Sequence, residues 1–390
     1  MSRILGFAVA SVGSLLGSAA LGQQSYWMNP NGGNYSDGSN WSLGSAGQYP
    51  TFNLGSTGYT VTTQSGNGAQ QLIVENDNVT LNLNSNTYTN GAIYVAAPET
   101  GETGSLTVVG PGAIEQPPEE AVVSIGSSDG SSTGTLTVNG ATIEQQNLGS
   151  SIFAQNLIVE NGGLIKQDGM SGEGDAITVG NLTENDGTIS SGANYAVLAG
   201  NVTLQNGSLF TAGGLDGAVD VYGSLTVDNS LIASGNDVDF ASIAQLMVTD
   251  GGTVESNQDL TLGGSTTILS GGVGAPDNTY FGNELTIQLD QPPEGASIVG
   301  AGTAFLGGTL SLTLQNGFSP TVGEQFQIMR FGDISGTFSS ISYPQLPDGE
   351  TFDTRNLYVN GTITVVPEPL SFGLCFGAGA FLCLRRRKRI

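Results

Sequence analysis

The residues of this chain best suited to catalysis are pairs of acidic residues two positions apart. On a β-strand this spacing places both carboxylates on one face, about 6.5–7 Å apart, which is compatible with the acid and base of an inverting glycosidase. The pairs are Glu75/Asp77, Glu184/Asp186 and Asp237/Asp239. With 34 acidic residues in the chain, such pairs also arise by chance. A polysaccharide-active β-helix enzyme using a pair such as Asp237/Asp239 is therefore the alternative function.

The remaining residue types exclude most other catalytic machinery. The chain has no histidine, which removes the commonest general base and the Ser-His-Asp triad. Its two cysteines, Cys375 and Cys383, lie in an apolar segment near the C-terminus, so the body offers no thiol nucleophile and no cysteine zinc site. Lys166 is the only basic residue within the repeats described below, so a polysaccharide-lyase base is missing too. We predict that the protein is not an enzyme and has no cofactor.

Calcium binding suits these acidic residues better than catalysis does, because calcium prefers hard oxygen ligands such as those found at turns. Asp216, Asp250 and Asp277 stand at glycine-rich corners, where turn formation is their expected role. The sequence contains neither a Gly-Gly-x-Gly-x-Asp nonapeptide nor an EF-hand loop. Calcium binding therefore stays a secondary expectation.

The body of the chain consists of a sequence repeat with four parts: small polar residues, a Leu-Thr-Val-like strand, a Gly/Asn turn and a second short apolar strand. Clear copies begin at Leu106, Leu136 and Leu225. The matching strands start at residues 106, 136, 157, 177, 202, 225 and 246, which gives repeats of 20 to 30 residues. The alternation places Leu and Val on one face and Thr on the other, and Asn-Gly or Asp-Gly supplies corners with positive φ. A period in the twenties fits one coil of three short strands, so we predict a parallel β-helix instead of a hairpin sandwich.

Two surface features of such a solenoid are candidates for binding sites. The threonines of the repeats would form one outward row, as in ice-binding solenoids, but Ile158 and Met247 interrupt it and the repeat length varies. The preference of threonine for strands is sufficient to explain the row. Tyr26, Trp27 and Trp41 suit either a carbohydrate-stacking platform or a cap over the open end of the coils, and we favour the cap.

Charge limits the partners. Between Gln23 and Val366 there are 33 acidic and three basic residues, a formal charge of −30. Nucleic acid is disfavoured because its phosphates need Lys and Arg to displace counterions. Anionic membranes and acidic polysaccharides are disfavoured as well, unless divalent cations bridge the like charges.

Both ends of the chain predict export. Arg3, the apolar run 4–16 and the small residues Ala20 and Gly22 form a secretory signal peptide with cleavage after Gly22. At the other end, an apolar run from Leu370 to Leu384 precedes a basic cluster that would stay cytoplasmic, so the body faces outward. The cluster is Arg385, Arg386, Arg387, Lys388 and Arg389.

This C-terminal order resembles the PEP-CTERM sorting signal: Val366-Pro367-Glu368-Pro369, then the apolar helix, then the basic cluster. The resemblance implies processing by an exosortase-like membrane protease in bacteria that make exopolysaccharide. The segments Gly308–Leu312, Gly323–Phe326 and Leu357–Gly361 resemble the β-rich region that often precedes the signal. The opening from Trp27 to Trp41 resembles that of similar surface proteins. Because this family has no shared catalytic residue, the resemblance implies none in this chain.

The sequence thus predicts an all-β fold: a parallel β-helix or solenoid body, a C-terminal β-sandwich-like module and a C-terminal transmembrane sorting helix. The expected divisions are a signal peptide (1–22), an aromatic cap (23–69), the solenoid (70–295), the C-terminal module (296–365) and the sorting signal (366–390). The expected function is that of a structural or adhesive protein of the cell surface or extracellular matrix. Its expected partners are exopolysaccharide or other matrix components, the exosortase-like protease, and, through the C-terminal helix, the inner membrane.

Overall fold

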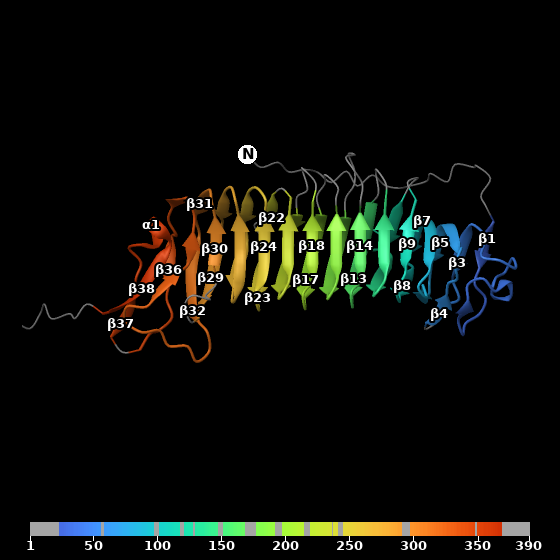
Figure 1. The fold of residues 1–390 in the computed structure, drawn as a ribbon, viewed down its shortest axis with the longest axis horizontal. Helices are drawn as coiled ribbons and strands as arrows, with labels where there is room; N and C mark the ends of the chain where they lie inside the picture. Colours follow the sequence, from blue (N-terminus) through green and yellow to red (C-terminus); the bar gives the residue numbers. More distant parts are fainter. Residues whose placement is uncertain are drawn as a thin grey trace, which may run out of the picture.

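The computed structural model shows an elongated rod of stacked β-coils, with a small separate sheet at its C-terminal end (Figure 1). It describes residues 23–55, 58–96, 101–117, 121–127, 129–146, 151–167, 177–191, 197–213, 219–235, 237–240, 245–290, 297–347 and 349–368. The signal peptide and the segment from Pro369 onwards, with the basic cluster, lie outside the described residues.

The coils contribute strands to three parallel sheets, of which the third begins at β7, and we number the sheets in the order in which the chain passes through them. The first sheet contains β1 (Gln24–Tyr26), β3 (Tyr49–Phe52), β5 (Gly68–Val74), β7 (Thr87–Val95), β10 (Val122–Ile125), β13 (Ser151–Glu160), β15 (Ile177–Asn185), β17 (Val197–Gln205), β19 (Val219–Val221), β22 (Val238–Phe240), β25 (Leu260–Leu262), β28 (Thr279–Phe281), β31 (Thr303–Leu306) and β35 (Asp333–Gly336). The second sheet contains β2 (Gly33–Asn34), β4 (Tyr59–Thr62), β6 (Asn78–Asn82), β8 (Thr103–Val109), β11 (Thr133–Asn139), the later halves of β13, β15 and β17, and then β20 (Ser224–Asp228), β23 (Gln245–Thr249), β26 (Ser265–Ile268), β29 (Glu284–Leu289), β32 (Thr309–Leu314) and β36 (Ser340–Ser342). The third sheet contains the start of β7, then β9 (Ala113–Gln116), β12 (Thr142–Gln145), β14 (Leu164–Gln167), β16 (Thr188–Ser191), β18 (Leu209–Ala212), β21 (Leu231–Ser234), β24 (Gly252–Ser256), β27 (Gly271–Ala275), β30 (Ser297–Gly300) and β34 (Met329–Arg330).

The pairing confirms the parallel solenoid and corrects one position of the predicted repeat. Leu106, Leu136 and Leu157 are paired in successive coils of the second sheet, but the next partner is Leu182, not residue 177. Ile177 pairs with Ile152 in the first sheet instead. The error arose because β15 passes through two sheets as one strand, so its first apolar residue belongs to a different face.

Alternation along each strand builds the core. In the second sheet the Leu and Val of each repeat point inward and the intervening residue points outward, as in β11, where buried residues alternate with half-buried ones from Gly134 to Asn139. The buried side chains form one continuous hydrophobic cluster from Trp27 to Val365. Burying each Leu, Ile or Val contributes about 1.5–3 kcal/mol, so stability is distributed along the whole rod.

The predicted corners with positive φ are present between the second and third sheets. Asn161, Asn206, Asn229 and Asp250 adopt φ between 45° and 57° there. Asparagine and aspartate tolerate this left-handed conformation, and in three of these corners a glycine with positive φ follows: Gly162, Gly207 and Gly251.

The interior also contains a polar row on the third sheet. Gln145 donates to Gln116 and Gln167 donates to Gln145, both at 2.7 Å, and Ser191 donates to Gln167 at 3.2 Å. These side chains are buried, and stacking in register lets each amide satisfy the next.

The coils continue into the region 296–365, where β30, β31, β32, β34, β35 and β36 extend the three sheets. A separate antiparallel sheet of β33 (Gln325–Gln327), β38 (Thr362–Pro367) and β37 (Glu350–Asp353), with β38 in the centre, follows at this end. Two short helices complete the described structure: the 3-10 helix η1 (Gly38–Asn40) and α1 (Leu357–Asn360). Within the described residues, no helix has the length and apolar character needed to cross a membrane.

Candidate functional site

The structure does not bring two of the three predicted carboxylate pairs, Glu75/Asp77 and Glu184/Asp186, together on strand faces. Glu184 is fully buried inside the rod, whereas Asp186 lies past the end of β15 at an exposed corner with φ of 55°. The predicted pairing of Glu184 with Asp186 is therefore wrong, because the strand ends between them and the corner turns their side chains to different sides.

Glu75 and Asp77 are separated in the same way by the corner between β5 and β6. Asp77 is buried and accepts hydrogen bonds from the Leu54 amide at 2.8 Å and the Tyr59 hydroxyl at 2.6 Å. Glu75 accepts a hydrogen bond from the Asn53 side chain nearer the surface. Burial, followed by the hydrogen bond to Asp77, raises the pKa of Tyr59 above its usual range. The expectation of a shared face is wrong here too, and Asp77 is a structural acceptor.

Asp237 belongs to a hydrogen-bonded row along a corner of the rod. Its carboxylate accepts from the Asp259 amide at 3.1 Å, and Asp259 accepts from the Asn278 amide at 2.9 Å. Asp237 lies just before β22, and the backbone of Asp239 pairs with Asp220 and Thr261 within the first sheet. The side chain of Asp239 lies outside the described part of the structure, so the pair itself stays a prediction.

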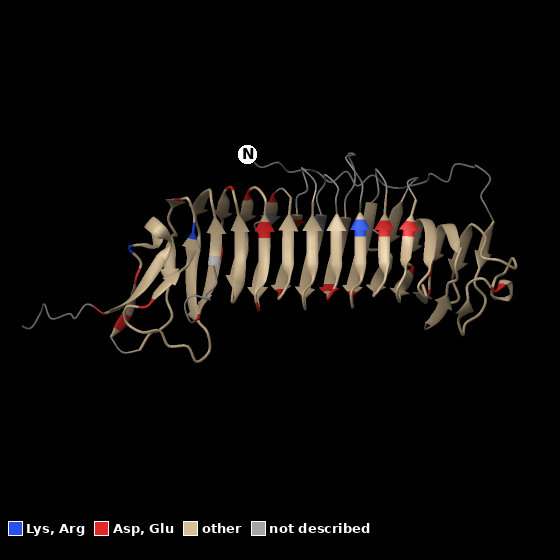
Figure 2. Ribbon diagram, viewed as in Figure 1, with Lys and Arg blue, Asp and Glu red and all other residues tan. Residues whose placement is uncertain are grey.

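Charged residues on the outer face of the third sheet occupy one row, seen in Figure 2 as isolated coloured positions near the strand tips. Glu115, Glu144 and Lys166 are paired in successive coils, and Lys166 lies 3.3 Å from the Glu144 carboxylate. Nowhere in the described ranges do three or more His, Cys, Asp or Glu side chains gather as metal ligands would. Asp250 and Asp277 are exposed at corners, which agrees with a role in turns, and Asp216 is outside the described residues.

The two tryptophans form the N-terminal cap. Trp27 and Trp41 are each 1% exposed, and their rings meet edge to face with centroids 5.0 Å apart. Phe52 and Tyr35 pack against Trp41, at 5.5 and 5.3 Å. Rings buried to this degree offer no platform to a sugar, and their burial agrees with the expected cap. Tyr26 alone of the three aromatics is exposed.

The outer face of the second sheet carries the predicted row of threonines, which we call the threonine row. Its members occupy the same outward position in successive coils: Thr60, Thr80, Thr107, Thr137, Ile158, Thr183, Thr203, Thr226, Met247, Thr267, Thr286, Ser311 and Ser342. Ile158 and Met247 interrupt it as expected. The variable repeat length does not disturb its register, because the extra residues of the longer coils lie outside the paired strands.

Short polar side chains flank the threonine row on one side. Asn181 donates to Asn156 and Asn201 donates to Asn181, both at 3.0 Å, so neighbouring coils are also linked outside the backbone ladder. Nearer the N-terminus the Ser105 hydroxyl donates to Asn78 at 2.7 Å.

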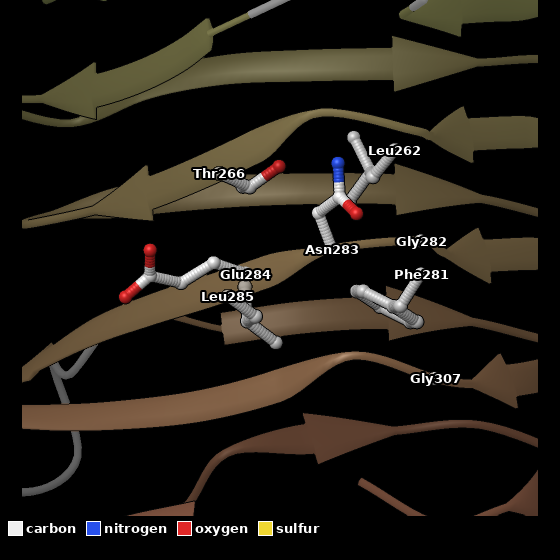
Figure 3. Close-up of a pocket in the computed structure, with 8 residues that line it drawn as sticks. All are labelled: Leu262, Thr266, Phe281, Gly282, Asn283, Glu284, Leu285 and Gly307. Atoms are coloured by element: carbon white, nitrogen blue, oxygen red, sulfur yellow. The ribbon is translucent and has the colours of Figure 1, made fainter. Parts of the chain in front are cut away.

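An open trough of about 300 Å³ lies over the first rungs of this face. It is lined by Gly58, Tyr59, Thr60, Asn78, Val79, Thr80, Ser105 and Thr107. Gly58 and Ser105 are short, which leaves the space above the strands empty. A second crevice, between β28 and β29, is shown in Figure 3 with Phe281, Asn283 and Glu284 around it. It has no room for a water molecule, so it offers no ligand site.

The start of the predicted sorting motif is part of the folded C-terminal sheet. Val366 pairs with Thr351 and Pro367 with Glu350, and the Glu368 amide donates to the Gly349 carbonyl at 2.7 Å. Pro367 and Glu368 are exposed. Pro369, the basic cluster, Ala20 and Gly22 lie outside the described residues, so the sorting and cleavage assignments stay predictions.

Compared with known proteins, the chain matches no family model and no curated sequence.

Proposed function

We propose that this chain is an exported structural or adhesive protein of the bacterial cell surface or extracellular matrix, associated with exopolysaccharide. The observation that carries the proposal is the uninterrupted rod: parallel ladders run from β1 to β36 around one core cluster. Such a solenoid presents long repetitive faces, and its ends need caps to stop edge-to-edge association. The tryptophan cluster and the antiparallel C-terminal sheet lie at these two ends.

The delivery of the protein is proposed from its termini. The signal peptide 1–22 directs export, and the helix Leu370–Leu384 anchors the protein in the inner membrane until an exosortase-like protease acts. The antiparallel sheet, together with the coils from β30 onward, is our candidate for the proposed β-sandwich-like module next to the tail. Because Val366 and Pro367 are strand residues, we expect processing beyond Glu368, which would leave β38 intact.

We propose no catalytic role and no cofactor. Two of the carboxylate pairs needed by the alternative enzyme are separated by corners, and Asp237 supports the backbone of the next coil. Calcium bridging between this acidic rod and acidic polymers is the cation role compatible with the charge of the chain.

The test is the intact mass and location of the native protein in its own cells, with and without the last 22 residues, a truncation after Glu368 that keeps β38. We expect a mature form ending shortly beyond Glu368, found at the surface or in the matrix only when the tail is present. An uncut protein retained in the membrane would contradict the processing step. Equal surface delivery without the tail would contradict the sorting role.

A further inference from the structure

We infer that the outer face of the second sheet, centred on the threonine row, binds an uncharged polysaccharide whose chain lies along the rod. This inference rests on the proposed function, since it identifies the face and the ligand class through which matrix association would occur. The trough beside Thr60, Thr80 and Thr107 is its best-formed part.

Charge selects the class of ligand. The body has a formal charge of −30, yet no member of the threonine row is charged, and three carboxylates on the same face, Glu160, Asp228 and Glu284, lie at strand ends two residues from the row. The trough is likewise lined by hydroxyl, amide and backbone groups without a carboxylate among them. An anionic polymer would be repelled by the rod as a whole, and a cationic one would find more acidic surface elsewhere. A neutral polymer is therefore the ligand that suits this face.

Geometry favours a long, repetitive ligand. Successive threonines are one strand spacing apart, about 4.8 Å, so the row extends for roughly 60 Å. Each offers a hydroxyl that can donate or accept and a methyl that can contact a sugar C–H face. Hydroxyl groups repeat along an extended glycan at a spacing of the same order. Many weak contacts on one chain then add up by avidity.

The outer face of the second sheet is also preorganised for binding. Threonine has a restricted χ1 angle, and the backbone is fixed by ladders on both sides. The flanking Asn156, Asn181 and Asn201 are held by hydrogen bonds to one another. Ordering such a surface on binding costs little conformational entropy.

Ice is the other ligand with a regular hydroxyl array, but this face is less suited to it. Flat contact would be interrupted by the half-buried Ile158 and by Met247, which is 44% exposed, while the trough hollows the first rungs. A flexible polymer chain can pass over such irregularities, whereas a crystal surface cannot. Ice binding is therefore an outcome of the test and not the proposal.

The test uses the native exported protein, purified from its cells, and measures its depletion from solution by insoluble cellulose, starch granules and immobilised alginate. The face variant is Thr80→Val/Thr107→Val, which removes two hydroxyls but keeps shape and strand preference. The matched control is Thr211→Val/Thr261→Val, on the outward faces of the third and first sheets. A further variant, Thr107→Arg, fills the trough.

We expect depletion by at least one neutral glucan, weakened about five- to 150-fold in the face variant and at least as much in Thr107→Arg, with no change in the control. The fold-change corresponds to two neutral hydrogen bonds. Binding should strengthen with the length of soluble glucan competitors and disappear for di- and trisaccharides. Unchanged circular dichroism and unfolding temperature in all variants would show that the loss is local.

Several outcomes would overturn the inference. One is no retention on either neutral glucan; another is equal loss in the face and control variants. Inhibition of ice growth that the face variant loses, without glucan binding, would replace the ligand class with ice. If the protein reaches the matrix only with its tail but binds no neutral glucan, this inference is wrong and the proposed function stands. If the protein binds a glucan but never leaves the membrane, the inference stands and the proposed function is wrong.

Discussion

At the residue scale, Glu184 departs most from the repeat pattern, in which inward positions are apolar. It occupies the inward row between Val159 and Leu204, and neither carboxyl oxygen has a hydrogen-bond partner among the described residues. Burial raises the pKa of this carboxyl well above its usual range, so it is protonated where ordinary glutamates are ionised. Its burial costs free energy that an aliphatic side chain would not lose.

We predict that Glu184→Leu stabilises the protein by about 1–3 kcal/mol near neutral pH, the usual cost of burying an unpaired polar group. Because the folded pKa is raised, the folded state binds more protons than the unfolded state above about pH 4.3, so stability falls as pH rises until the folded pKa is passed. The variant should lose this slope, which is at most about 1.4 kcal/mol per pH unit.

Chemical denaturation from pH 4 to 9 measures both effects. The matched control is Glu255→Leu, an outward and exposed glutamate on β24, which should change stability by less than about 0.5 kcal/mol. A wild-type protein whose stability does not fall more steeply with pH than that of Glu184→Leu would contradict the assignment.

At the element scale, stacking in register lets a polar residue be buried at low cost. Gln116, Gln145 and Gln167 each lie on a different strand of the third sheet, yet they share one chain of hydrogen bonds. The central Gln145 uses both its amide donor and its carbonyl acceptor in that chain. Removing it alone breaks two bonds, whereas removing the whole row leaves fewer groups unsatisfied.

We therefore predict that Gln145→Met destabilises the protein by about 2–4 kcal/mol, because it leaves Gln116 and Gln167 with unpaired buried groups. The triple variant Gln116→Met/Gln145→Met/Gln167→Met should cost less than the single variant, since methionine has a similar volume. Equilibrium unfolding in urea measures the free energy of unfolding of each variant. If the losses in the single variants add up to the loss in the triple variant, the row is not a cooperative unit.

At the scale of the whole molecule, each coil contacts mainly its two neighbours, so stability is close to a sum of coil and interface contributions. Leu157 is buried in a central coil, paired with Leu136 on one side and Leu182 on the other. A cavity there acts on both interfaces at once.

We predict that Leu157→Ala costs about 2–5 kcal/mol and that the loss is felt locally. Amide hydrogen exchange should accelerate most in β11, β13 and β15, less in β8 and β17, and least in the C-terminal sheet. Leu157→Met is the control that keeps volume and should leave exchange close to the wild type. Uniform acceleration along the rod would show a single cooperative unit instead.

The sequence by itself determined the period, the corners and, within the Leu-x-Val repeats, which residues point inward and outward. Leu106, Thr107 and Val108 alternate because a strand has a side-chain period of two, and asparagine corners such as Asn206 tolerate positive φ wherever they occur. These are local properties of the chain, so reading along it recovers them. The burial of Trp27 and Trp41 was expected for another reason, because large aromatics near an open end have an apolar surface to cover.

Only the tertiary structure decided which side chains meet. Glu184 and Asp186 are two residues apart yet lie on different sides of a corner, while Gln116 and Gln167 are far apart in sequence yet belong to one hydrogen-bonded row. Likewise, the threonine row keeps its register across repeats of unequal length because the backbone ladder aligns strands and not sequence intervals. Contacts between coils depend on where each strand ends and which neighbour it pairs with, and that information is held by the folded ladders.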